Sequence, residues 1–190
     1  MLRGFLRISI LVGCFSSAFV AVAAQEVVHA LAGTVRSIDA TAKTISIETD
    51  DGSEGLFNDL ADPKATFTFD KKISAGATAP GTFKEVGVCV IVYYIGNGDV
   101  RTVVALQNLG AGPFVKSRGT IVGIEGKEHR FTVKDESGAV KTFWITSETV
   151  VETGFGATEG FKSQLKKGDP VQVTSEAATK NAGALFISAL

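Results

Sequence analysis

Residue types that could bind a metal or perform catalysis are sparse in this sequence. Histidine occurs only as His29 and His129, and cysteine only as Cys14 and Cys89. A metal site needs several such side chains, or carboxylates, gathered at one point. Nucleophilic catalysis needs a serine, threonine or cysteine beside a base. No spacing in the chain indicates such a set, so we predict no catalytic residue, no metal ligand and no cofactor.

The best single candidate for a binding residue is Trp144, the only tryptophan. It follows Phe143, which has the parity of a core residue, so Trp144 should point out of the same strand. Lys141 lies close by in sequence. Small barrels that bind polymers often place aromatic rings beside cations. We therefore predict a weak ligand- or partner-binding surface that includes Trp144 and Lys141.

Three polar segments have the composition of tight turns. They are Asp50-Asp51-Gly52-Ser53, Gly96-Asn97-Gly98-Asp99 and Asp135-Glu136-Ser137-Gly138. Acidic loops can hold calcium, but these segments lack the regular ligand spacing of a calcium loop. Glycine, aspartate and asparagine tolerate the backbone angles of hairpin turns. We predict hairpins at these positions.

The elements that must position these residues occur twice along the chain. Gly33-Thr34-Val35 falls on Gly119-Thr120-Ile121 at a fixed shift, and at the same shift Phe57 falls on Phe143. The agreement lies in glycines and in the phase of the apolar positions, which are the features that a fold constrains. The sequence predicts two copies of one module.

Within each copy, apolar residues mostly alternate with polar residues, which is typical of β-strands. The opening strands depart from this alternation in the same way. Val35 and Ile38 are three residues apart, and so are Ile121 and Ile124. A β-bulge in each strand would return both members of a pair to the core. Bent first strands of this kind are expected in a small closed barrel.

A short helix is predicted before the fourth strand of each copy. Thr82-Phe83-Lys84-Glu85 fits a capping box in the first copy. Phe161 and Leu165 lie four residues apart in the second copy, and Gly168 would end that helix. The resulting order is three strands, a short helix and two strands. We predict an all-β chain of two tandem, five-stranded OB-like barrels, with an SH3-like or other small barrel as the alternative.

The second copy carries a recognisable pattern of turns and core positions. The pattern consists of Gly119, Ile121, Ile124, Phe131, Val133, Gly138, Phe143, Gly168, Asp169, Val171 and Val173. It resembles a widespread class of secreted bacterial small β-barrel domains of unknown function. The resemblance covers both copies and is better in the second. It implies export and a β-barrel, and it implies no activity.

The N-terminus has the layout of a secretory signal. Arg3 and Arg7 precede an apolar run that ends in small residues at Ala21, Ala23 and Ala24. This run is shorter than the roughly 20 residues that a spanning helix needs. No later apolar run is long enough to span a bilayer. The predicted organisation is a signal peptide at 1–24, a first barrel at 25–108, a linker at 109–115 and a second barrel at 116–190.

The two cysteines bear on location. Leu11-Val12-Gly13-Cys14 resembles a lipobox, so a lipid anchor at Cys14 is a minor alternative to cleavage near Ala24. Cleavage would leave Cys89 alone in a run of apolar residues. We expect Cys89 to be buried in a strand, with an intermolecular disulfide as the other possibility. The predicted location is the periplasm or the exterior.

Charge argues against a nucleic-acid partner. The whole chain has a formal net charge of −1, and loss of the signal removes two arginines and no acidic residue. Nucleic-acid binding depends largely on cations that contact phosphates. We therefore predict no nucleic-acid binding.

One apolar stripe distinguishes the first copy from the second. Ile91 and Tyr93 should face outward from the fourth strand of the first barrel, where the second barrel has Gln172 and Thr174. An outward apolar stripe needs cover. We expect the second barrel to provide it, because tethered neighbours meet at high effective concentration. A partner molecule, including a second copy in a homodimer, is the alternative.

These observations predict an exported binding or interaction module that is not an enzyme. Its partner would be a protein, an envelope component or a small ligand. One alternative is a periplasmic metal-handling protein, which would bind added metal stoichiometrically. A second alternative is an envelope hydrolase, which would need a pocket with convergent carboxylates.

Overall fold

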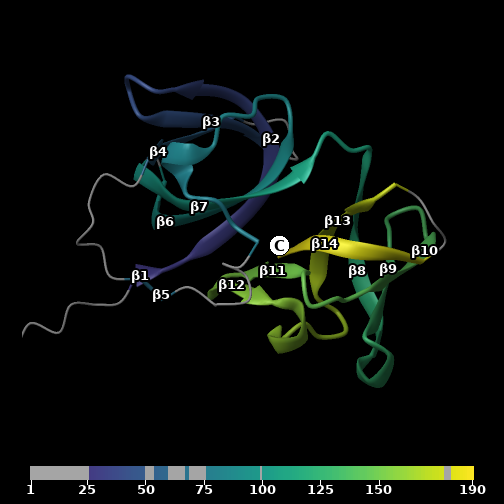
Figure 1. Cartoon of the computed structure of the whole chain (residues 1–190). Helices are drawn as coiled ribbons and strands as arrows, with labels where there is room; N and C mark the ends of the chain where they lie inside the picture. The colour runs from purple at the N-terminus through teal and green to yellow at the C-terminus, as the bar shows by residue number, and fades with distance from the viewer. Residues whose placement is uncertain (1–25, 50–53, 60–66, 69–75, 99, 178–180) are drawn as a thin grey trace, which may run out of the picture.

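A computed structural model describes residues 26–49, 54–59, 67–68, 76–98, 100–177 and 181–190 (Figure 1). The predicted signal peptide, Cys14 and the predicted turn at 50–53 lie outside the described residues. The strands of the first half are β1 (Glu26–Val27), β2 (His29–Asp39), β3 (Thr44–Thr49), β4 (Glu54–Asp59), β5 (Phe67–Thr68), β6 (Cys89–Asn97) and β7 (Val100–Gly110). Those of the second half are β8 (Phe114–Glu125), β9 (Arg130–Lys134), β10 (Val140–Trp144), β11 (Val150–Thr153), β12 (Gly156–Glu159), β13 (Pro170–Glu176) and β14 (Asn181–Ala189).

The first half of the chain forms a closed five-stranded barrel. Its strands pair in the ring β2-β3-β4-β7-β6, and β6 closes the ring by pairing with β2. All neighbours are antiparallel except β4 and β7, which are parallel. This closed ring, with its last two strands exchanged relative to the chain order, fits an OB-like barrel.

The second half forms a seven-stranded sheet with the order β10-β9-β8-β13-β14-β11-β12. An additional parallel pairing joins β10 to β14. The strands β8, β9, β10, β14 and β13 therefore also form a ring of five pairings, and its one parallel pair stands at the same place as in the first barrel. The hairpin of β11 and β12 extends the sheet beyond this ring from β14.

The cores lie inside the two rings, at the positions that the alternation predicts. Buried side chains in the first barrel are Val35, Ile45, Ile47, Phe57, Phe83, Val90, Val92, Val103 and Leu106. Those in the core of the second half are Ile121, Phe131, Val133, Phe143, Val151, Val171, Val173, Ala182, Ala184 and Ile187, of which Val151 comes from β11 outside the ring. The inward parity assigned to Phe143 is thus confirmed.

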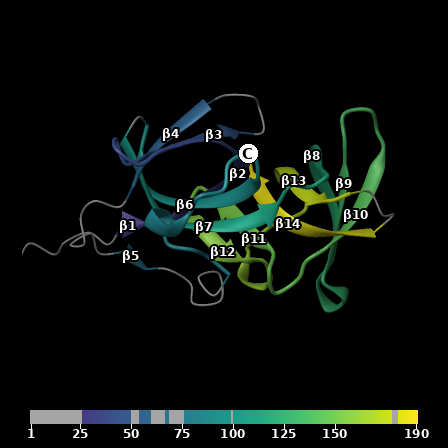
Figure 2. The ribbon, with the colours of Figure 1, turned by 45° about the horizontal axis from the view of Figure 1, so that its top comes forward.

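The predicted bulges are present in both opening strands. The register of β2 against β3 shifts between Val35 and Ser37, and the register of β8 against β9 shifts between Ile121 and Gly123. The two bulged strands, β2 and β8, are labelled in Figure 2. The bulge returns Ile38 only partly to the core, and Ile124 stays 41% exposed, because it lies next to the open end of the strand.

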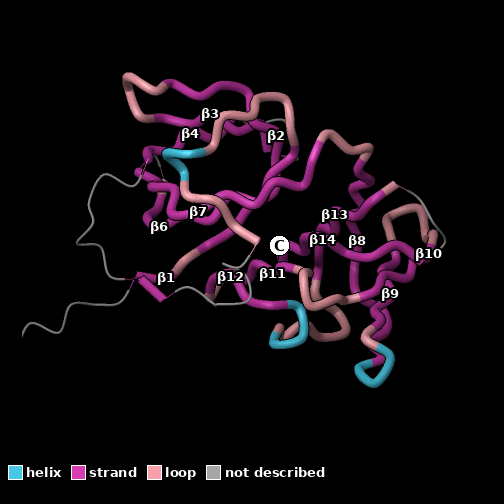
Figure 3. The backbone as a smooth tube through the Cα atoms, viewed as in Figure 1, coloured by secondary structure: helices cyan, strands magenta, loops and turns pink. Residues whose placement is uncertain are grey.

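The predicted short helices are not observed at their expected residues. Three-residue 3-10 turns stand there instead, η1 (Pro80–Thr82) and η3 (Gly160–Lys162), while η2 (Gly126–Glu128) joins β8 to β9 (Figure 3). The Thr82 hydroxyl donates to the Ala79 carbonyl at 2.8 Å rather than capping a helix. A segment this short has little helical stability of its own, so its packing against the barrel decides its form.

The structure also shows the predicted turn at Asp135, the surroundings of Cys89 and the segment between the two halves of the chain. The turn at Asp135 is a hairpin turn in which Gly138 has a φ of +87° and donates its N–H to Asp135 O. Cys89 is buried. Strand β7 continues to Gly110 and β8 begins at Phe114. Among the described residues no helix is long and apolar enough to cross a bilayer.

Candidate binding groove and the contact between the barrels

Trp144 lies on the outer face of β10, as the alternation predicts, and is 36% exposed. The guanidinium of Arg130, on the neighbouring strand, lies 5.2 Å from the centre of the indole ring. The same guanidinium forms ion pairs with the carboxylates of Glu125 and Glu128. The positive charge of Arg130 beside Trp144 is therefore already neutralised by carboxylates.

Lys141 does not share a surface with Trp144. Its side chain has the inward parity of Phe143, and its ammonium donates to the hydroxyl of buried Ser117 at 3.1 Å. This contact borders a small hollow of about 120 Å³. The structure thus separates the two residues that the sequence placed together, because neighbours of opposite parity on one strand face opposite sides of the sheet.

Ile91 and Tyr93 are not available to an external partner. Both side chains are 0% exposed. They pack in a cluster that joins the outer face of β2, β6 and β7 to the second sheet, with members Val28, Ala30, Ala32, Ile95, Ala105, Val150 and Phe186. The hairpin of β11 and β12 lies beside β2 (Figure 1). The second sheet covers the stripe, so the alternative in which Ile91 and Tyr93 contact a ligand or partner molecule is corrected.

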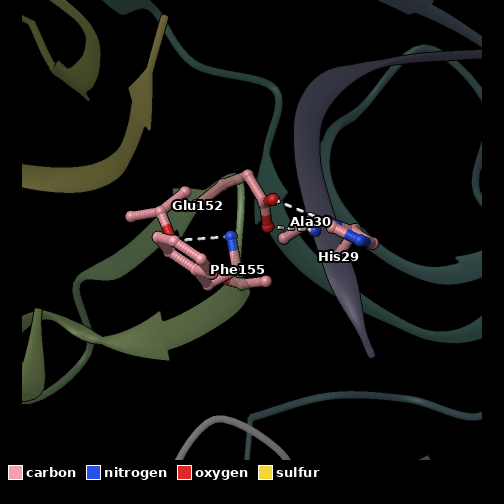
Figure 4. Close-up of polar contacts among 6 residues, drawn as sticks. His29, Ala30, Glu152 and Phe155 are labelled. Carbon is pink, nitrogen blue, oxygen red and sulfur yellow. Dashed lines mark hydrogen bonds and ion pairs between the residues drawn. The ribbon is translucent and has the colours of Figure 1, made fainter. Parts of the chain in front are cut away.

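A buried polar contact crosses the same boundary (Figure 4). Glu152 of β11 accepts a hydrogen bond from His29 Nδ1 at 2.7 Å and another from the backbone N–H of Ala30 at 2.8 Å. Its side chain is 14% exposed. Burial raises the pKa of Glu152, and the two hydrogen bonds offset part of that increase. The Glu152 carboxylate of the second sheet thus accepts two hydrogen bonds from the first residues of β2.

Further aromatic and charged groups surround this contact. The ring of Tyr94 lies 5.8 Å from that of His29, and the guanidinium of Arg101 lies 4.3 Å from the centre of the Phe57 ring. Burial raises the pKa of Tyr94, the Glu152 charge raises it further, and Arg101 lowers it. Through His29 and Glu152, this cluster joins the first barrel to the second sheet.

A groove of about 510 Å³ lies in the second half of the chain. It lies between the β11–β12 hairpin, the segment after η3 and the end of β14. Its apolar lining consists of Phe155, Leu165, Pro170, Ala189 and Leu190. Its polar lining consists of Thr153, Thr158, Lys162, Gln164, Lys166 and Asp169. We call it the Phe155 groove.

Phe155 is the most exposed large apolar side chain described, at 92%. It stands in the turn between β11 and β12, where its N–H donates to the Thr153 hydroxyl at 3.2 Å. Gly156 follows with a φ of +106°, and a Cβ there would lie 2.4 Å from Val27 Cγ1. The hairpin is thus held against the N-terminal segment while its tip presents Phe155 to solvent.

The charged side chains on the groove wall differ in whether they have a hydrogen-bonding or ion-pairing partner. The Asp169 carboxylate accepts the backbone N–H of Lys166 at 2.7 Å, and Lys162 Nζ lies 3.5 Å from the buried carboxylate of Glu159. The Lys166 ammonium makes no ion pair within the part of the chain that the structure describes. The wall thus presents the Lys166 ammonium beside an apolar lining, with the Asp169 carboxylate on the same wall.

A second, smaller hollow of about 150 Å³ lies on the other side of η3. Leu165 lines both hollows. The smaller one is bordered by Phe161, whose ring lies 4.5 Å from that of His129. The second histidine is thus placed by ring contact rather than among metal ligands.

Sequence reasoning missed the Phe155 groove. Its residues come from separate segments that only the sheet brings together. One signal was present: Phe155 stands between Gly154 and Gly156, and an aromatic ring at the tip of a glycine-flanked turn has no strand to carry it into the core. That position is typical of an exposed contact residue.

Among the described residues no group of three or more histidine, cysteine or acidic side chains could hold a metal ion. The comparisons with known proteins add little. No family model matches the chain, and no curated protein matches it. One solved structure, described as "drosophila Unr CSD456", matches with a TM-score of 0.32 and 16% identity over 85% of this chain. The match covers 61% of that longer chain.

Proposed function

We propose that this chain is an exported, non-enzymatic binding module that holds a small ligand in the Phe155 groove. The observation that carries the proposal is the groove itself. Its volume of about 510 Å³ lies within the range of small-molecule sites. It combines an apolar lining with a few polar groups, which is the usual composition of such sites.

The proposal includes two tandem OB-like modules, one for each half of the chain. The matching order of pairings in the two rings supports this, as do the equivalent bulges in β2 and β8. The covered stripe adds a role for the first module. By packing on β11 and β14 it fixes the sheet that carries the groove, and a preorganised site binds at lower entropic cost.

The proposal excludes nucleic acid as the partner. OB-like barrels that bind single strands use aromatic rings within a positively charged groove. Here the exposed ring of Trp144 is paired with Arg130, and Glu125 and Glu128 both contact that arginine. Two carboxylates beside the only tryptophan would repel a phosphate backbone.

Native mass spectrometry of the chain, purified from the periplasm of an exporting host, tests the proposal. We expect the processed chain to retain an added mass of small-molecule size, and we expect Phe155→Ser to lose it. The matched control is Val140→Ser, which changes another exposed apolar residue outside the groove. If all three proteins carry the same mass, or if none carries any, the groove is not the ligand site.

A further inference from the structure

The Phe155 groove is asymmetric in its chemistry, and this asymmetry limits what it can hold. Phe155, Leu165 and Pro170 supply apolar surface. Contact with them favours an apolar ligand group, because burial of apolar surface is favourable roughly in proportion to its area. The occupant therefore has an apolar portion.

The charges on the wall specify the other end of the occupant. Asp169 is engaged by the backbone N–H of Lys166, so its carboxylate stabilises the turn. The Lys166 side chain extends from this turn without an ion pair to any described residue. Lys162, on the same wall, is already engaged by the carboxylate of Glu159. An anionic group beside the Lys166 ammonium would be attracted to it, whereas a cationic group would be repelled.

A hydroxyl on the groove wall adds a polar requirement. Thr158 lines the groove, and its Oγ1 is shielded from water without a hydrogen bond to any described residue. Buried hydroxyls are normally hydrogen-bonded. A rotation about χ1 would exchange this hydroxyl with the methyl group, and an oxygen-bearing ligand could then provide the missing partner.

The backbone around the groove favours a small molecule over a peptide. Extended peptides commonly bind by adding a strand to an open sheet edge. The outer side of β12 already receives Val28, whose carbonyl accepts the Ala157 N–H at 2.8 Å, and β11 has strand neighbours on both sides. The Leu190 N–H donates to Pro170 O at 3.0 Å. Recognition in the groove therefore depends on side chains.

From these observations we infer that the ligand of the Phe155 groove is an anionic amphiphile, a molecule with one alkyl chain and a carboxylate or comparable acidic head. The inference rests on the proposed function, since it names the ligand class of the same groove. The alkyl chain lies along Phe155 and Leu165, and the head lies beside Lys166.

Calorimetric titration with three amphiphiles of equal chain length tests the inference. The probes are dodecanoate, dodecyltrimethylammonium and dodecyl maltoside, each below its micelle concentration. We expect dodecanoate to bind most tightly and the cationic probe most weakly. Lys166→Glu should weaken dodecanoate binding about fivefold or more, as expected for reversal of an exposed charge contact. Lys127→Glu, at an exposed lysine that does not line the groove, is the matched control.

The outcomes separate the ligand class from the site. If all three probes bind equally and Phe155→Ser weakens each, the groove binds ligands but the anionic preference is wrong. If no probe binds, or if Phe155→Ser leaves binding unchanged, the groove assignment itself fails. If an acidic, leucine-rich peptide binds where dodecanoate does not, the occupant is a protein segment and the inference is overturned.

Discussion

At the scale of single residues, Glu152 shows how a polar group can join the first barrel to the second sheet. It accepts hydrogen bonds from His29 and from the Ala30 N–H. A buried carboxylate without such donors would be costly, and a donor left without its acceptor would also be costly. No partner for His29 is recognisable in the sequence, because Glu152 lies on a strand more than a hundred positions away.

Replacement of Glu152 by alanine should destabilise the fold by about 1–3 kcal/mol, since the buried Ala30 N–H loses its acceptor. Glu152→Gln should cost less, because its amide oxygen can accept the Ala30 N–H while its amide nitrogen donates to the other tautomer of His29. Urea unfolding at neutral pH measures both effects. Equal stability of the wild-type and alanine proteins would show that the contact is not formed.

The raised pKa of Glu152 sets the pH dependence of this comparison. Its stabilising contribution is present below the ordinary value of 4.5 and is lost as the pH rises through the raised folded-state pKa. The wild type should therefore gain stability relative to Glu152→Gln as the pH falls from 8 to 4. Glu148→Gln, which removes an exposed carboxylate away from this contact, is the matched control. An opposite slope would mean that the hydrogen bonds outweigh burial.

At the scale of elements, two glycines explain how the opening strands curve. A Cβ on Gly33 would lie 2.5 Å from Glu48 O, and one on Gly119 would lie 2.3 Å from Lys134 O. Both are mid-strand positions, just before the bulges, where the next strand crosses closely. Their correspondence along the chain therefore reflects a shared close approach of backbones rather than shared turns.

Gly33→Ala and Gly119→Ala should each destabilise the fold by about 1–3 kcal/mol, the usual cost of forcing an added methyl group into a packed site. Gly183→Ala is the matched strand control, because nothing lies within 4 Å of its Cβ position. Thermal and urea unfolding of the three variants would measure the difference. A loss in Gly183→Ala as large as in the other two would contradict the account.

The elements also show what the sequence could and could not predict. Alternation placed Phe57, Phe143 and the valines of β6 and β13 inside their rings, and the three-residue spacing predicted both bulges, because such patterns follow directly from strand geometry. The two predicted helices are not formed, because an apparent capping box and one apolar pair are too little to stabilise a helix. Pro80 and Gly160 instead begin 3-10 turns.

At the scale of the whole molecule, the apolar stripe of the first barrel is the surface on which the second sheet packs. Ile91 and Tyr93 face out of their own barrel and are still fully buried. Tyr93 also donates its hydroxyl to Gln107 Oε1 at 2.8 Å, and burial raises its pKa. The stripe could be predicted by comparing the two halves of the sequence. The Phe155 groove could not be predicted, since its lining residues come from separate segments that meet only in the folded second half.

Phe186→Ala should destabilise the chain by about 3–5 kcal/mol, because it removes a buried ring from the contact between the two sheets. Phe155→Ala removes a ring that is 92% exposed and should change stability by no more than about 0.5 kcal/mol. Urea unfolding followed by circular dichroism measures both. If Phe186→Ala proved as stable as the wild type, β14 would not cover the stripe.

The central claim is that the Phe155 groove binds the ligand, and an NMR titration of the chain with dodecanoate tests it most directly. The account predicts amide shift changes concentrated at 153–170 and at 189–190, with the indole N–H signal of Trp144 unchanged. The single tryptophan provides an internal reference on another face. Changes centred on Trp144 and β9, with the groove signals unmoved, would contradict the account and move the binding surface to the β9–β10 face.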